Sequence, residues 1–556
     1  MKQIINIKNS LLSALICLLV LTFTACRKQL DRDPLTAYTG TNVWTSKDGA
    51  MLALTAVYRG NITFISTDAE YTPSDWWSYM GLISLEFATD NAYDRRGDNS
   101  VYNLMTSGGM VATNANLGYY WSLSYQRIAR ANFFLENVGQ TPVDQATLNR
   151  WKAEARFLRA TQYFYLSQYF GSVPLVTKTL TTEQANTVRK TSRDSVIIYA
   201  ETEFAAAAND LPRYKDLPAA ERGRATKQVA LAFLGRLQLA NKEYTAAAAT
   251  FKSIIDFGDN IIDPKFSSLF DGTNENSKEI IFATQFVIDK ASNPMALHYF
   301  PAKWGGYHLF NPLGNLVENF EFTDGTTFSY TDARYNAANL QQNRDPRLGY
   351  TVLYNGQTFA GLTYVCHPDS TTSPDQLTTT RQATRTGYCM RKFLSPQQYG
   401  GSLANSGVDI PIVRYAEVLL SYLEANLEAG STISQSLLDQ TINAVRGRAD
   451  VQMPKVTETD PAKLRVILRR ERRNELAFEG LRYWDLLRWG TAAQVLSGDF
   501  YGAPFPGAKN LRKAPSGAID PFSRWYVTTK NFSAGNNQPF WPIPQSEVNL
   551  NPNLGK

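Results

Sequence analysis

The stretch ALAFLGRLQLANKEYTAAAATFKSII, residues 230–255, decides the fold. Apolar and small residues recur at three- and four-residue intervals through 227–241 and again through 244–255, which is the spacing of one helical face. Only a short polar break separates the two runs. The stretch therefore predicts two antiparallel helices that pack closely through their small residues.

The same helical spacing recurs on both sides of this pair. It predicts helices at 125–138, 151–170 and 196–211, and further helices at 413–428, 435–448 and 462–478. Repeated antiparallel helix pairs indicate a stacked, solenoid-like scaffold, and the 230–255 pair is typical of tetratricopeptide-type hairpins. We therefore predict a mainly α protein, with a helical scaffold over about 40–260 and 408–490.

Two regions differ from this scaffold in their residue composition. Between about 260 and 405, Gly, Pro, Asn, Asp and Thr punctuate short runs, and the runs at 279–283, 350–354 and 391–393 are predicted strands. A second loop-rich block spans about 490–540. Long irregular segments inside a compact protein usually carry function. We therefore expect these two blocks to face a ligand.

The first residues predict export. Lys2 and Lys8 precede the apolar run LLSALICLLVLTF at 11–23, which is the length of a signal-peptide core and shorter than the roughly 20 residues of a membrane span. The run closes on small residues and Cys26, which resembles a bacterial lipobox. We expect a signal peptide over 1–25 and a mature chain of 26–556 with lipid on Cys26. The alternative is an ordinary secretory signal cut near Ala25.

Composition narrows the functional class. The formal net charge of +6 is mild and no basic stripe is present, so we expect no nucleic-acid partner. Aromatic residues reach 12%, which favours stacking surfaces. Beyond Cys26 only Cys366 and Cys389 remain. They allow one disulfide at most, and neither has CxxC spacing.

The most tempting catalytic pattern is a row of carboxylates at Glu471, Glu475 and Glu479. Four-residue spacing places them on one helical face, whereas a glycosidase needs its two carboxylates on opposite sides of the scissile bond. We interpret the row as a structural ion network. The expected cationic partners are interleaved in the same stretch: Arg469, Arg472, Arg473 and Arg482.

Other catalytic and metal-binding signatures are missing from the sequence. The three histidines, His298, His308 and His367, form no HExxH pattern and no tight cluster. The chain has no GxSxG nucleophile elbow and no phosphate-cradling loop. We therefore predict no enzyme, no metal site and no cofactor.

Aromatic residues in loops carry the binding hypothesis, because sugars lay their C–H faces on Trp or Tyr while polar side chains take the hydroxyls. The first cluster is Tyr71, Trp76, Trp77 and Tyr79, followed by Asn91, Tyr93, Asp94, Arg95 and Asn99. The second is Tyr299, Trp304, Tyr307 and His308. Trp304 is the preferred residue, because Gly305-Gly306 allows a sharp turn that presents the indole outward. The alternative for these loop aromatics is packing under the loops. Trp121, Trp151, Trp484 and Trp489 lie on helical faces, and we expect them in the core.

The chain resembles the SusD/RagB family of Bacteroidetes outer-membrane lipoproteins along nearly its whole length. The resemblance rests on strings in a fixed order: Leu30-Asp31 with Pro34; Trp121, Tyr125 and Ala131-Asn132; 153–160, Tyr163-Phe164 and 170–175; 223–225; 411–418 with Glu424-Ala425; 443–446; 471–480, Arg482, Asp485-Leu486 and 488–490; and 542–544 with Glu547 and Asn551-Pro552.

This resemblance implies a surface lipoprotein of the outer membrane that captures oligosaccharide and hands it to a SusC-like, TonB-dependent barrel. It also implies that the binding face draws on the two aromatic regions named above. The nearest alternative is the same architecture carrying peptide, as some RagB-like members do. A surface glycoside hydrolase and a purely structural lipoprotein are the alternatives from other classes.

Overall fold

The computed structural model describes residues 42–59, 79–107, 110–378, 383–532 and 540–555. The predicted signal peptide lies outside these residues. So do Cys26, Tyr71, Trp76 and Trp77, so the predictions made for them remain predictions.

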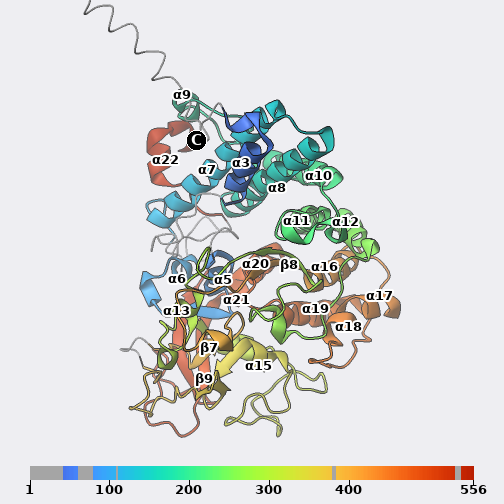
Figure 1. The fold of residues 1–556 in the computed structure, drawn as a ribbon. Helices are drawn as coiled ribbons and strands as arrows, with labels where there is room; N and C mark the ends of the chain where they lie inside the picture. The colour runs from blue at the N-terminus through green and yellow to red at the C-terminus, as the bar shows by residue number, and fades with distance from the viewer. Residues whose placement is uncertain (1–41, 60–78, 108–109, 379–382, 533–539, 556) are drawn as a thin grey trace, which may run out of the picture.

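A row of packed helices forms the frame of the molecule. Helices α7 (Ala115–Asn137), α8 (Gln145–Tyr169), α10 (Arg193–Asp210), α11 (Lys227–Ala240) and α12 (Tyr244–Phe257) pack one against the next. Helix α16 (Tyr415–Glu428) continues the row against α12, and α19 (Pro461–Glu475) packs on α16. The mainly α, helical-pair scaffold is confirmed, and its two predicted halves join through the α12–α16 contact (Figure 1).

Local chemistry explains why these helices begin, end and pack where they do. The Asp144 carboxylate caps α8 by accepting the Thr147 backbone N–H at 2.9 Å. Gly258 ends α12 in the left-handed region, with φ +65°. A Cβ on Gly235 would lie 2.6 Å from Cζ of Phe251. Helices α11 and α12 therefore approach as closely as they do because residue 235 has no side chain.

Several predicted helix bounds need correction. The helices expected at 125–138 and 151–170 begin earlier, at Ala115 and Gln145. The single helix expected at 435–448 is divided at Thr441 into α17 (Gln435–Gln440) and α18 (Ile442–Arg446). The helix expected at 462–478 ends at Glu475, because Phe478 and Gly480 adopt positive φ angles of 68° and 74°. Glu479 therefore lies beyond the helix that carries Glu471 and Glu475.

The described strands form five two-stranded antiparallel sheets. The prediction at 279–283 is confirmed by β2 (Ile280–Thr284), which pairs with β8 (Ile410–Arg414). The prediction at 391–393 is wrong, because the strand there is β7 (Tyr388–Met390), and Phe393 has a φ of 68°. The 490–540 block holds more order than expected, namely the hairpin of β9 (Ser497–Pro504) and β10 (Arg524–Asn531).

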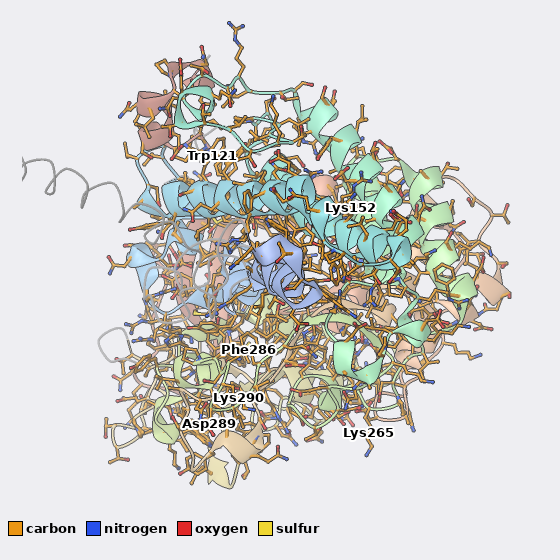
Figure 2. The ribbon with its side chains drawn as sticks, turned by 45° about the horizontal axis from the view of Figure 1, so that its top comes forward. Trp121, Lys152, Lys265, Phe286, Asp289 and Lys290 are labelled. Carbon is orange, nitrogen blue, oxygen red and sulfur yellow. The ribbon has the colours of Figure 1, made fainter. Side chains whose placement is uncertain are left out.

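The remaining elements are short and lie mostly around the loop-rich half. Figure 2 shows Trp121 and Lys152 along the long helices α7 and α8, with Phe286, Asp289 and Lys290 in the loop-rich part away from them. The other α-helices are α3 (Lys47–Arg59), α5 (Gly81–Leu85), α6 (Val101–Met105), α9 (Thr182–Ala185), α13 (Met295–Tyr299), α14 (Gly314–Val317), α15 (Arg347–Thr351), α20 (Arg482–Arg488), α21 (Ala492–Val495) and α22 (Gln545–Leu550). The other strands are β1 (Ala92–Asp94), β3 (Phe310–Pro312), β4 (Val352–Tyr354), β5 (Thr358–Phe359) and β6 (Leu362–Thr363).

Cys366 and Cys389 are buried free thiols. The Cys366 Sγ–H donates to the Gly387 carbonyl at 3.0 Å, and that of Cys389 to the Tyr299 carbonyl at 3.3 Å. Burial raises the pKa of both thiols. Across the described part of the chain, none of the helices combines the length and apolar character that crossing a bilayer requires.

Candidate functional site

Pairing of β1 with β3 brings the two predicted aromatic regions together. Tyr93 lies opposite Asn311 and Asp94 opposite Phe310 in this antiparallel pair. The Arg95 backbone N–H extends the pairing by donating to the Leu309 carbonyl at 3.1 Å. Two segments far apart in the chain thus meet along one short ribbon. We call the solvent-accessible residues along it, Tyr93, Arg95, Asn99 and Tyr307, the β1/β3 face.

Three rings stack beside this ribbon. His298 lies between Tyr79 and Tyr307, with ring centroids 5.9 and 5.6 Å away and both interplanar angles at 27°. Tyr79 and His298 are buried, whereas Tyr307 is 46% exposed. Tyr307 is therefore the accessible end of the stack, supported from behind by His298.

The middle ring of the stack is held neutral. The Tyr79 hydroxyl and His298 Nδ1 lie 2.8 Å apart in a hydrogen bond. Burial, assisted by the positive charge of Arg96, lowers the pKa of His298 to about 4. At neutral pH the imidazole is uncharged, so the stack presents an apolar rather than a cationic support to Tyr307.

The outward orientation predicted for Trp304 is wrong. Its side chain is 3% exposed, and its indole Nε1–H donates to the Phe359 carbonyl at 3.2 Å. Gly305, with φ +89°, does produce the expected sharp turn, but the turn folds the loop back onto α13. The indole finds its partner among Phe359 and Tyr364 in the interior. Trp304 is a core residue that supports the loop carrying Tyr307.

His308 is likewise an internal support. It is fully buried, with Nδ1 3.3 Å from the Asp375 carboxylate and Nε2 3.4 Å from the Tyr364 hydroxyl. The same carboxylate accepts the backbone N–H groups of Ala302 and Lys303 at 2.7 and 3.1 Å. Asp375 therefore fixes the loop from both ends, and direct ligand contact by His308 is not compatible with this burial.

The first aromatic region divides between structural and accessible residues. Asp94 is buried, and its two carboxylate oxygens accept hydrogen bonds from Arg96 Nε and Nη2 at 3.0 and 2.6 Å, so the carboxylate already has a charged partner. Tyr93 and Arg95 are partly exposed and Asn99 is exposed. Burial, with the negative charges of Asp98 and Asp94, raises the pKa of Tyr93 to about 12. Its hydroxyl therefore remains a proton donor over the physiological range.

Sequence reasoning missed two arginines at this face. Arg385 is tied to β3, because its backbone N–H donates to Asn311 Oδ1 at 2.7 Å. Arg512 comes from the segment before β10 and lies with its guanidinium 5.1 Å from the centroid of the Tyr526 ring. Both guanidinium groups are close enough to Tyr93 to affect its ionisation. Neither residue belongs to a local pattern that could have identified it.

The structural ion network around Glu475 is confirmed, but with different partners. Glu475 is fully buried and contacts Arg347, Arg414 and Arg448 at 3.0, 3.0 and 2.7 Å. Burial alone would raise its pKa, yet the surrounding guanidinium charges hold it well below its usual range. Glu471 binds Arg347 at 2.6 Å and Arg446 at 2.6 Å. Glu479 binds Arg414 and Lys392 at 2.6 and 2.7 Å.

The arginines predicted to serve this network bind elsewhere. Arg472 pairs with Asp485 at 2.7 Å, and both Arg473 and Arg482 pair with Asp90. Arg469 lies 4.5 Å from the centroid of the Trp489 ring. The three glutamates are thus neutralised by cations from distant segments, which ties the α19 region to the rest of the protein.

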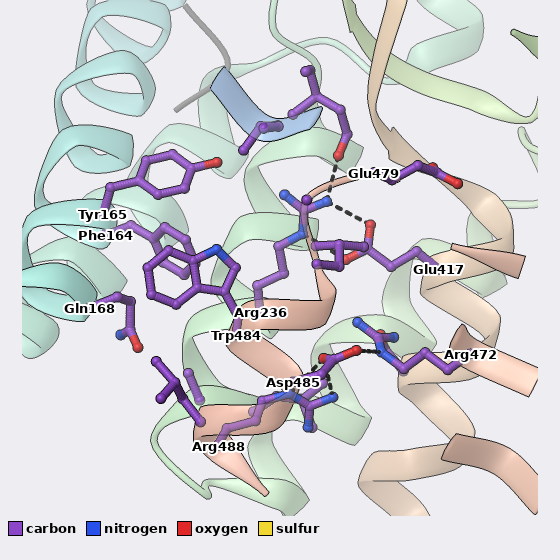
Figure 3. A pocket seen from close by; sticks show the side chains of 18 of the residues that line it. Phe164, Tyr165, Gln168, Arg236, Glu417, Arg472, Glu479, Trp484, Asp485 and Arg488 are labelled. Atoms are coloured by element: carbon purple, nitrogen blue, oxygen red, sulfur yellow. Dashed lines mark hydrogen bonds and ion pairs between the residues drawn. The ribbon is translucent and has the colours of Figure 1, made fainter. Parts of the chain in front are cut away.

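A cavity of about 250 Å³ lies between the helical row and the C-terminal helices (Figure 3). Phe164, Tyr165 and Trp484 line one side, and ion pairs line the other. The pairs are Arg236–Glu417 at 2.6 Å, Arg472–Asp485 at 2.7 Å and Arg488–Asp485 at 2.8 Å. Its volume falls below the about 300–1,000 Å³ usual for ligand pockets, and these carboxylates already have partners. The cavity is a weaker candidate site than the β1/β3 face.

Comparisons with known proteins agree with this architecture. The model of the SusD family matches residues 278–556, and a model described as starch-binding associating with outer membrane matches residues 68–239. A solved SusD-like carbohydrate binding protein from Bacteroides fragilis is 47% identical, with 92% of this chain and 100% of that chain covered and a TM-score of 0.88. The chain belongs to the SusD family.

More distant relatives are also similar to this chain in sequence and structure. A SusD-like protein from Bacteroides ovatus is 24% identical over 500 residues, which are 84% of this chain and 80% of that relative. Surface glycan-binding protein A from Bacteroides uniformis is 20% identical, with 91% of this chain and 98% of that chain covered and a TM-score of 0.66. At that identity the likeness shows the fold alone.

Proposed function

We propose that this chain binds a saccharide at the β1/β3 face and passes it to a TonB-dependent outer-membrane barrel. One observation carries the proposal: Tyr307 is an exposed ring backed by the neutral His298, on the segment that leads into β3, and the partner strand β1 carries Tyr93. Such a ring offers an apolar floor for a sugar, and Asn99, Arg95 and the Tyr93 hydroxyl can take its hydroxyls. The printed description of the 47% identical relative, a carbohydrate binding protein, supports the same ligand class.

The binding face would draw on three parts of the chain. Tyr93, Arg95 and Asn99 come from the N-terminal part, Tyr307 and Arg385 from the 260–405 block, and Arg512 from the 490–540 block. The loop-rich blocks would thus face the ligand, and the helical row would hold them in place.

The proposed action is binding without bond cleavage. A hydrolase working through the glutamate row would need a free carboxylate, whereas Glu471, Glu475 and Glu479 are each bound to guanidinium or ammonium groups. Incubation of the purified protein with a saccharide that it binds should leave the saccharide length unchanged. Cleavage that tracks the protein through purification would contradict this part of the proposal.

Tyr307→Ala tests the binding face. Stacking on an aromatic ring contributes about 0.5–1.5 kcal/mol beyond area burial, so with the lost apolar contact affinity should fall about ten-fold or more. Affinity electrophoresis on a polysaccharide panel measures the effect, with melting temperature as the check on folding. Tyr119→Ala is the matched control, since Tyr119 is a tyrosine of 47% exposure on α7. Equal affinity of wild type and Tyr307→Ala for every bound polysaccharide would contradict the proposal.

The location proposed for this activity is the outer membrane, through lipid on Cys26. The support is the lipobox-like end of the apolar run and the outer-membrane association in the description of the model that matches 68–239. Cys26→Ala should move the protein from the membrane fraction to a soluble fraction. Its retention in membranes would contradict the lipid anchor, and absence of a co-purifying barrel from solubilised membranes would count against the transfer step.

A further inference from the structure

Two arginines beside the β1/β3 face, Arg385 and Arg512, have no acidic partner among the described residues. Arg385 Nη1 donates to the Thr378 carbonyl at 2.7 Å, and its Nε lies 3.5 Å from the Arg95 carbonyl. Arg512 Nη1 donates to the Val527 carbonyl at 3.0 Å, and its guanidinium packs on the Tyr526 ring. Among the residues that the structure describes, neither guanidinium forms an ion pair, and each keeps unused N–H donors.

The two arginines also act on each other. Burial lowers the pKa of Arg385, and the positive charge of Arg512 lowers it further. Both residues are partly buried rather than fully hydrated. Bringing two like charges together at a partly desolvated site has an electrostatic cost, which a bound anion would offset.

The nearby acids do not offset this charge within the protein. Asp94 is already bound to Arg96 in a bidentate pair. Asp98 is exposed and acts on the Tyr93 hydroxyl, but it contacts neither Arg385 nor Arg512. The face therefore carries an excess of positive charge next to an un-ionised tyrosine hydroxyl that can donate a hydrogen bond.

We propose that the saccharide bound at this face is anionic, and that its carboxylate or sulfate group is taken by Arg385 and Arg512 beside the Tyr93 hydroxyl. The planar guanidinium fork matches the paired oxygens of both groups. Tyr307 precedes Asn311 by four residues, and at roughly 3.3 Å per residue this places them no more than about 13 Å apart, a span for a short oligosaccharide. One sugar ring would lie on Tyr307 while an acidic group elsewhere in the chain meets the arginines.

This inference rests on the proposed function. It is tested with pairs of polysaccharides in which one member is acidic and the other, the masked member, lacks the negative charge. Polygalacturonate is compared with its methyl ester, dextran sulfate with dextran, and amylopectin serves as a further neutral reference. The wild-type protein should bind at least one acidic member ten-fold or more tightly than its masked partner. The two pairs distinguish carboxylate from sulfate, and 0.5 M NaCl should reduce the preference because exposed charges are then screened.

Variants assign the preference to the arginines. Arg512→Gln should reduce the preference for the acidic member about ten-fold, whereas Arg512→Lys, which keeps the charge, should retain much of it at an unchanged melting temperature. Arg189→Gln, at an exposed arginine near α9, is the control and should behave as wild type.

The outcomes separate this inference from the function on which it rests. Equal binding of acidic and masked members, or binding of amylopectin alone, overturns the inference and leaves saccharide binding in place. An acidic preference that Arg512→Gln leaves intact also overturns it. Failure of the wild-type protein to bind any polysaccharide counts against both proposals.

Discussion

Arg414 and Arg448 lie in the interior, and each is paired with at least two carboxylates, namely those of Glu279, Glu475 and, for Arg414, Glu479. By contrast, the structure describes no carboxylate partner for Arg385 or Arg512 among the residues that it covers, and their side chains donate to carbonyl oxygens. A buried charge is tolerated only with a partner, and these carboxylates supply that partner for both interior arginines within the chain. The guanidinium charges of the two arginines beside the β1/β3 face have no carboxylate within the described part of the chain, and this difference distinguishes a structural network from a binding surface.

Removing one member of the interior network should have the largest effect. Glu475→Gln leaves Arg347, Arg414 and Arg448 without their shared carboxylate, so we expect a loss of about 3–5 kcal/mol in the free energy of unfolding. Urea denaturation measures it, and Glu183→Gln on the exposed α9 is the control, with a change within about 0.5 kcal/mol. A loss as small as that of the control would mean that the network is not structural.

Trp304 and Tyr307 lie in the same loop, but their alanine variants should differ strongly in stability. Trp304→Ala removes a buried indole and should cost about 3–5 kcal/mol of stability. Tyr307→Ala removes an exposed ring and should change stability by about 0.5 kcal/mol or less. Thermal unfolding of the two variants side by side is the measurement. Equal melting temperatures would contradict the assignment of Trp304 to the core.

The pH dependence of the free energy of unfolding tests whether His298 is buried and neutral between Tyr79 and Tyr307. Its folded-state pKa of about 4 lies below the ordinary value of 6.5, so between these values the unfolded chain takes up a proton that the folded chain does not. His298 therefore stabilises the fold most above pH 6.5, and its contribution falls as the pH drops towards 4. Relative to His298→Gln, the wild type should lose roughly 2 kcal/mol over this range. Parallel urea titrations at several pH values that show a constant difference would refute the buried, neutral imidazole.

The smallest effects on stability are expected from alanine substitutions of two glycines in the helical row. Gly235→Ala introduces a Cβ 2.6 Å from the Phe251 ring, and the overpacking cost of about 1–3 kcal/mol exceeds the gain of up to about 1 kcal/mol in helix propensity. At Gly118 on α7 the nearest atom would be Ser546 Oγ at 3.6 Å, an ordinary contact. Gly118→Ala should therefore stabilise by about 0.5–1 kcal/mol. Effects of the same sign in denaturant titrations would contradict the close α11–α12 approach.

The parts of the fold that sequence could predict are those governed by local periodicity. The helices of the row follow from apolar spacing and caps within a single segment, and their ends lie within about two residues of prediction, although α7 and α8 begin ten and six residues earlier than predicted. The glutamate row was recognised as structural for the same reason. Its partners were not, because Arg347, Arg414 and Arg448 come from segments that only the tertiary fold brings to Glu475.

The candidate site depended on contacts that no local pattern contains. Gly305-Gly306 predicts a sharp turn, but the direction in which Trp304 points is set by Phe359 and Tyr364, which lie further along the chain. Pairing of β1 with β3 is likewise non-local, although the two regions that it joins were both predicted to contribute to binding. Arg385 and Arg512 are isolated residues in loops, and only their common proximity to Tyr93 makes them notable.

A crystal structure of the protein with the oligosaccharide that it binds most tightly tests the central claim most directly. The account predicts a sugar ring over the Tyr307 side chain, at van der Waals distance, with polar contacts from the β1/β3 face. It also predicts an unchanged network around Glu475. A saccharide in the cavity between Tyr165 and Trp484, with Tyr307 left in solvent, would contradict the claim.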